Sequence, residues 1–131
     1  MTRFVVDLSA VLHLAETERA VAAAHQLLAP TLLRSQTLSA LHEAVQRGDL
    51  PADIARERLA RIGHMPIRLL GDAVLRRRAW EVADQLDWPS TYRAEYVALT
   101  QLQADKLITM DPELAPALQG IIPIGSVDEL Y

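Results

Sequence analysis

The chain has 131 residues, half of them apolar, with a formal net charge of −4 and no cysteine. This length suits one domain, expected over residues 1–131, and the lack of thiols excludes cysteine nucleophiles and cysteine-based zinc sites. The uncharged apolar stretches are far shorter than the roughly 18 residues of a membrane-spanning helix, and the N-terminus shows no signal pattern. We therefore expect a cytoplasmic domain without a membrane anchor.

The first half of the chain predicts one strand followed by three helices. Residues 4–6 are a short apolar run that ends in Asp7, as is typical of a buried parallel strand. Thr17 is suited to cap a helix that continues to Leu28 and ends before Pro30. Two further helices, each with a glycine at its end, are predicted over residues 33–47, followed by Gly48, and over residues 51–63.

The second half alternates strands and helices. Residues 67–70 indicate a short strand, and Asp72 is suited to cap a helix that ends before Pro89. Residues 106–109 indicate another strand, closed by Asp111. The other expected elements are a helix through residues 96–102 capped by Ser90 or Thr91, a short helix near residues 113–118 and the apolar run 121–124. This alternation predicts an α/β domain with a short, mostly parallel sheet flanked by helices.

Charge is distributed unevenly along the chain. Residues 34–78 contain nine arginines and five acids, whereas the rest contains four basic and twelve acidic residues. A basic section on an acidic protein suits a local patch that faces phosphates, with Arg34, Arg76 and Arg77 as candidate contacts. The alternative is a set of solvated helix faces on which arginine stems cover apolar surface.

Two acids, Asp7 and Asp111, follow predicted strands. Binding sites of parallel sheets form at the carboxyl ends of the strands, so we expect both carboxylates in one crevice. An acid at the end of a buried strand is costly unless it is paired, capped or bound to a cation, and paired carboxylates suit Mg²⁺ or Mn²⁺. The alternative is an unrelated α/β domain in which both acids only cap the turns that follow them.

Four segments, in order, resemble the motifs of PIN domains. In that family the first motif is an Asp after a strand, followed by a hydroxyl residue and an apolar helix, and the second enters a helix and presents a Glu. The third motif is usually written Tyr-Asp-Ala-x-Tyr-x-Ala-Leu-Ala, and the fourth is a strand closed by Thr-x-Asp. The matching segments are residues 7–12, residues 29–36 with Gln36 at the position of a family Glu, residues 91–100 with Arg93 at the position of an Asp, and residues 106–111. The segments span nearly the whole chain, and its length and helical pattern resemble VapC toxins of VapBC toxin–antitoxin modules.

The resemblance implies a PIN-like three-layer sandwich and a metal-dependent endoribonuclease. In that family three or four carboxylates hold one or two divalent ions, which activate water for in-line attack on an RNA phosphodiester. It also implies a homodimer and a VapB-like antitoxin as partner. Carried over to this chain, the implied catalytic positions are Asp7, Ser9, Gln36, Arg93, Thr109 and Asp111. Ser9 would bond a metal-bound water or merely cap a helix.

Two of these positions depart from the family pattern. Gln36 keeps an oxygen ligand without its charge, whereas Arg93 reverses a charge beside a site for a dication. At roughly 4 Å and an effective dielectric of about 20, each unit–unit interaction is worth about 4 kcal/mol. If Arg93 faces inward, it competes with the metal ion for Asp7 and Asp111, and a bidentate salt bridge from its guanidinium could replace the ion. Turned away, it leaves a two-carboxylate site with weak metal affinity.

One further acid could compensate for the lost carboxylates. Glu43 lies two helical turns beyond Gln36 on the same face, about 10 Å along the axis, and could reach a deep crevice as a ligand. Without such compensation, the alternative function is a catalytically inactive PIN-like domain that binds RNA or a protein. The aromatic residues are expected in the core or in an interface rather than in base stacking; they are Trp80, Trp88, Tyr92 and Tyr96.

Overall fold

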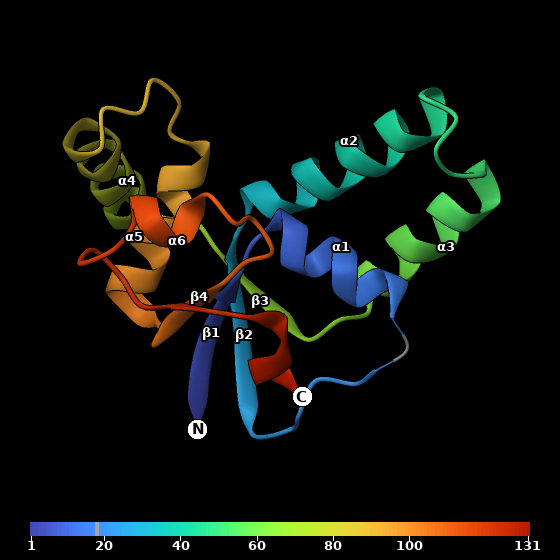
Figure 1. Ribbon diagram of the computed structural model, residues 1–131, viewed down its shortest axis with the longest axis horizontal. Coiled ribbons are helices and arrows are strands. Elements are labelled where there is room, and N and C mark those ends of the chain that lie inside the picture. Colours follow the sequence, from blue (N-terminus) through green and yellow to red (C-terminus); the bar gives the residue numbers. More distant parts are fainter. Residues whose placement is uncertain (18) are drawn as a thin grey trace.

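The computed structural model describes residues 1–17 and 19–131 (Figure 1). Within these residues, five strands form one parallel sheet in the order β3-β2-β1-β4-β5. The strands are β1 (Thr2–Val6), β2 (His25–Pro30), β3 (Ile67–Leu70), β4 (Lys106–Ile108) and β5 (Ile124–Gly125). The helices are α1 (Leu8–Glu16), α2 (Leu32–Gln46), α3 (Ala52–Gly63), α4 (Ala73–Gln85), α5 (Tyr92–Gln103) and α6 (Leu114–Ala117), followed by the 3-10 turn η1 (Val127–Leu130).

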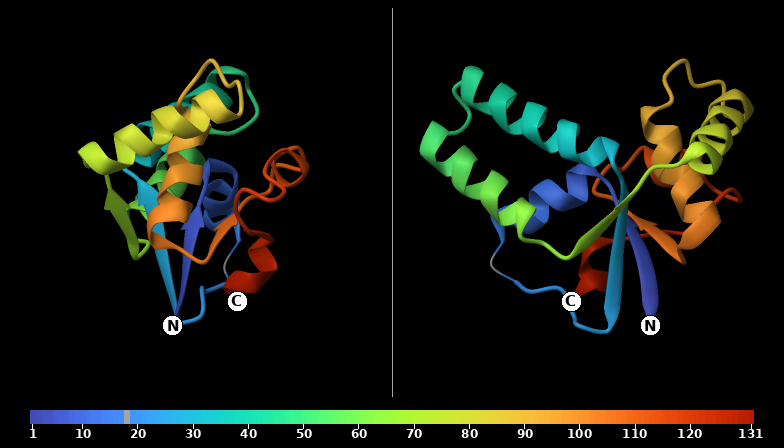
Figure 2. Two further views of the ribbon diagram at one scale, coloured as in Figure 1. Left: turned by 90° about the vertical axis from the view of Figure 1, so that its left-hand side faces the viewer. Right: turned by 180° about the vertical axis from the view of Figure 1, so that it is seen from behind.

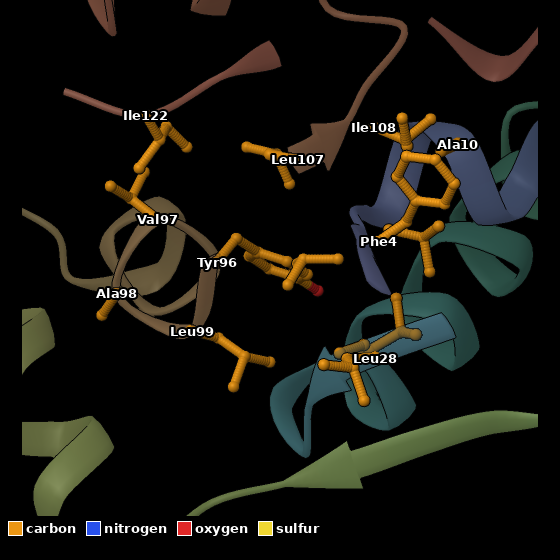
Figure 3. Close-up of a cluster of buried hydrophobic side chains, with 14 of the residues drawn as sticks. Phe4, Ala10, Leu28, Tyr96, Val97, Ala98, Leu99, Leu107, Ile108 and Ile122 are labelled. Atoms are coloured by element: carbon orange, nitrogen blue, oxygen red, sulfur yellow. The ribbon is translucent and has the colours of Figure 1, made fainter. Parts of the chain in front are cut away.

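The helices cover both faces of the sheet, so the fold is a three-layer α/β sandwich. Helices α4 and α5 pack together on one side, while α1 and the hairpin of α2 and α3 lie on the other (Figures 1 and 2). The core extends over both faces of the sheet, and in the part between α5 and the central strands Tyr96 points into the cluster that contains Leu28 and Leu107 (Figure 3). No helix in the described part of the chain has the length and apolarity needed to cross a membrane.

Most expected elements are confirmed, and two of their end signals, Gly48 and Asp72, act as the sequence predicts. Gly48, with a φ of 81°, follows α2 in the left-handed conformation that favours glycine. Asp72 caps α4, because its Oδ1 accepts a hydrogen bond of 2.9 Å from the Leu75 amide. Strand β4 ends at Ile108, one residue earlier than expected, so Thr109 already belongs to the loop that follows it.

The helix expected from Thr17 to Leu28 is wrong. Residues 25–30 form β2, which pairs with both β1 and β3, residues 19–24 are irregular, and residue 18 lies outside the described residues. The register places Leu27 beside Phe4 and Leu28 beside Val5. Because β2 is buried on both faces, its apolar residues run consecutively, and such a run is compatible with a helix or with an inner strand.

The turn after α4 holds an uncommon backbone conformation. Asp87 has a φ of 55°, the Asp87 amide bonds Asp84 O at 3.3 Å, and the Trp88 amide bonds Ala83 O at 2.9 Å. This pattern is a Schellman motif, in which glycine fits the left-handed position without steric cost. We expect Asp87→Gly to raise the free energy of unfolding by about 0.5–1 kcal/mol in urea denaturation. Asp84→Gly, inside the same helix, should lower it by about 0.5 kcal/mol; two changes of the same sign would contradict this account.

Candidate active site

Side chains at the ends of β1 and β4 meet in one cavity of about 210 Å³. These two strands are direct neighbours in the sheet, with Val6 paired to Ile108, so the residues that follow them emerge at the same edge. Helices α1, α2 and α5 supply the other walls. The polar residues that line the cavity are Asp7, Ser9, Gln36, Arg93 and Asp111, together with the hydroxyl-bearing Tyr96.

Asp7 is nearly buried and is held in place by α1. Its side chain is the N-cap of that helix: Oδ1 accepts hydrogen bonds from the Ala10 amide at 3.0 Å and from Ser9 Oγ at 2.6 Å. Asp7 therefore caps α1 and lines the cavity at the same time. Because these bonds engage one carboxylate oxygen, Oδ2 of Asp7 has no hydrogen-bond partner among the described residues and is available to a ligand.

Ser9 connects the two strand ends. Besides its bond to Asp7, Ser9 Oγ accepts a hydrogen bond of 2.8 Å from the Met110 amide and lies 3.3 Å from Thr109 Oγ1. Thr109 is buried, and its Oγ1 accepts a bond of 3.0 Å from the Asp111 amide. Ser9 thus orients the Asp7 carboxylate, and the two hydroxyl residues together hold the backbone of the loop between β4 and α6.

Arg93 turns toward the cavity and pairs with Asp111. Its Nη2 donates to Asp111 Oδ2 at 3.1 Å, while Asp111 Oδ1 accepts from the Glu113 amide at 3.0 Å. The contact is a single hydrogen bond to one acid, not a bidentate bridge. The Arg93 side chain is 57% exposed, and ion pairs at such positions are worth at most about 1 kcal/mol. The competition with a cation is therefore weaker than the coulombic figure of about 4 kcal/mol for each pair of charges indicates.

Gln36 is held by a hydrogen bond from α5. Tyr96 Oη donates to Gln36 Oε1 at 2.5 Å. Burial, and to a smaller extent the charges of Asp7 and Glu95, hold the pKa of Tyr96 well above its usual range, so the hydroxyl stays protonated and remains the donor. The amide oxygen of Gln36 is therefore engaged, and its NH₂ group, which has no partner among the described residues, is the part available to a ligand.

Several sequence candidates lie outside this cavity. Glu43 is exposed and accepts a hydrogen bond of 3.0 Å from Ser39, because α2 leads away from the strand ends (Figure 1). The expectation that Glu43 could serve as a ligand is wrong for this arrangement. Arg34, on α2, lines a different cavity. Arg76 and Arg77 are exposed on α4, on the side of the sheet opposite α2. The described residues contain no cluster of three His, Cys, Asp or Glu suited to a metal ion.

A second cavity, of about 420 Å³, borders the first one and was not foreseen from the sequence. Its lining residues are Gln36, Trp88, Pro89, Ser90, Tyr92 and Arg93. Tyr96 is buried as expected and Trp88 is partly buried, but Tyr92 is 58% exposed and Trp80 is 67% exposed. The only signal for this cavity in the sequence is the aromatic pair that flanks Pro89 and Ser90.

The two carboxylates fit a divalent ion provided that Arg93 moves. Asp7 and Asp111 offer the hard oxygen ligands that Mg²⁺ and Mn²⁺ prefer, and Ser9 keeps Asp7 oriented. The opposing group is the guanidinium of Arg93, whose exposure lets it rotate into solvent at low cost.

Comparison with known proteins yields likeness in structure but none in sequence. No family model and no curated protein matches the chain. Among solved structures, the chain is similar to the crystal structure of PAE2754 from Pyrobaculum aerophilum, with a TM-score of 0.73 and 22% sequence identity, over 98% of this chain and 93% of that one. At this level of identity the likeness shows the fold alone: the chain has the three-layer α/β sandwich of that protein.

Proposed function

We propose that the protein is a PIN-type endoribonuclease of the VapC kind with attenuated, metal-dependent activity. The observation that carries this proposal is the cavity lined by both Asp7 and Asp111, at the ends of neighbouring parallel strands. The order of the four sequence motifs supports it. The proposed partners are an RNA substrate, a VapB-like antitoxin and a second copy of the chain, in the cytoplasm.

Each polar residue of the cavity has a task in this proposal. Asp7 and Asp111 would hold Mg²⁺ or Mn²⁺, which supplies Lewis-acid chemistry and an activated water when bound. Ser9 orients the Asp7 carboxylate through its bond of 2.6 Å. Arg93, once released from Asp111, offers N–H donors to a non-bridging oxygen of the phosphodiester, a group that guanidinium binds well.

The attenuation follows from the number of carboxylates. Two acids neutralise a dication less effectively than three or four, and Gln36 contributes no charge. The ion pair of Arg93 adds a smaller penalty, because the arginine is largely exposed. Phosphate oxygens of bound RNA would complete the ligand set, so metal affinity should be higher with substrate than without it.

A specific observation favours a second candidate function. Arg93 already neutralises Asp111, and the described residues hold no three-acid cluster. Both facts suit a PIN-like domain that binds RNA or a protein without cleaving RNA.

Cleavage of single-stranded RNA separates the two functions. With Mn²⁺ or Mg²⁺ we expect slow cleavage that EDTA abolishes, and a loss of roughly a hundredfold in Asp7→Asn, which removes one ligand charge and weakens the α1 cap. Asp105→Asn is the matched control, because Asp105 lies before β4, at the opposite end from the cavity, and accepts from the Arg3 amide. A folded native protein and a folded Arg93→Asp variant that both fail to cleave RNA would contradict the nuclease proposal.

A further inference from the structure

We propose that the cavity bordered by Trp88 and Tyr92 is a subsite for an unpaired base of single-stranded RNA. This inference deepens the proposed function and rests on it, since it places the base next to the phosphate that the carboxylate site would act on. The first reason is continuity: Gln36 and Arg93 line both the carboxylate cavity and the aromatic one. A ligand can therefore occupy both cavities through these two shared residues.

Local contacts restrain the backbone that carries the aromatic wall. Trp88 follows the Schellman motif of α4, in which its amide bonds Ala83 O at 2.9 Å, and its ring packs partly against the core. Pro89 fixes its own φ and restricts the preceding Trp88, and Ser90 Oγ accepts a bond of 3.3 Å from the Tyr92 amide at the start of α5. The backbone that carries both rings is therefore restrained before a flat ligand binds, which lowers the entropy lost on binding.

The exposure of the Tyr92 ring has no counterpart in the packing of the core. Tyr92 is 58% exposed although it borders a cavity of about 420 Å³. Every nucleobase has a π face, and stacking on an aromatic side chain tolerates any sequence. Two aromatic rings in one cavity, with an arginine at its edge, match a base and the phosphate attached to it.

The two residues shared by both cavities, Gln36 and Arg93, offer the hydrogen-bond donors that RNA can accept from. Arg93 carries a positive charge, and Gln36 offers its NH₂ group because Tyr96 occupies its amide oxygen. Both groups donate hydrogen bonds, and phosphate oxygens and base carbonyls accept them. Double-stranded RNA does not fit, since its bases are already stacked within the helix.

Binding without metal tests this subsite separately from cleavage. The experiment measures the fluorescence anisotropy of a labelled single-stranded RNA hexanucleotide with the full chain in EDTA. Tyr92→Ala should weaken binding roughly tenfold or more, whereas Tyr92→Phe should retain it because the ring remains. Trp80→Ala is the matched control: Trp80 is 67% exposed on α4 and does not line the cavity, so binding should not change.

Two kinds of outcome overturn the inference. The first is native affinity in both Tyr92→Ala and Trp88→Phe/Tyr92→Ala, with folding verified by circular dichroism. The second is a native protein that binds the hexanucleotide no better than a duplex of the same sequence, or not at all. Metal-dependent cleavage with RNA binding that does not depend on Tyr92 would contradict the subsite alone. Binding that depends on Tyr92, without cleavage at any metal concentration, would support the subsite and contradict the nuclease.

Discussion

Replacing Arg93 by Asp is expected to tighten Mn²⁺ binding at least roughly tenfold. The substitution removes the partner of Asp111, 3.1 Å away, and adds a carboxylate to the wall of the cavity. It changes the local charge by two units, and even with strong screening at a side chain 57% exposed, each unit contributes to the affinity for a dication. Calorimetric titration of the native protein, Arg93→Ala and Arg93→Asp should give an increasing series of affinities, since Ala removes the competitor without adding a ligand.

A matched control separates this local effect from the change in net charge. Arg34→Asp makes the same substitution at an exposed position of α2 outside the cavity, so it should leave Mn²⁺ affinity close to native. A second readout is thermal: Mn²⁺ should raise the unfolding temperature of Arg93→Asp more than that of the native protein, because it binds only the folded state. Equal affinities in the native protein and Arg93→Asp would show that this arginine has no part in a metal site.

Leu28→Ala should lower the free energy of unfolding by about 3 kcal/mol. Leu28 is only 2% exposed in β2, between β1 and β3, and truncation of a buried leucine loses transfer energy and leaves a cavity. Leu38→Ala, at a position 56% exposed on α2, is the control and should cost less than about 0.5 kcal/mol. Urea denaturation measures both. A loss below 1 kcal/mol at Leu28 would contradict the place of β2 inside the sheet.

The boundaries that could be predicted from the sequence are those with local stereochemical signals. Gly48 and Asp72 mark helix ends, because a left-handed backbone and a side-chain cap depend on nearby residues only. The strand β2 could not be distinguished from a helix, since burial on both faces removes the alternation that identifies a strand.

The candidate site divides in a similar way. Strand ends in a parallel sheet were enough to predict that Asp7 and Asp111 share a crevice, and the structure places them there. The contact of Arg93 with Asp111 and the bond from Tyr96 to Gln36 depend on how α5 is rotated against the sheet, which no local pattern specifies. The sequence left open whether Glu43 reaches the crevice, because the direction of α2 relative to the strand ends is set by tertiary packing.

The pairing of β1 with β4 has a consequence for protein synthesis. Asp7 is synthesised about a hundred positions before its partner strand and Asp111, a separation that takes about 5–20 s at typical elongation rates. A nascent chain without residues 106–111 has one carboxylate, no Ser9–Met110 bond and no closed pocket. The polypeptide therefore cannot assemble the site before residue 111 has been translated.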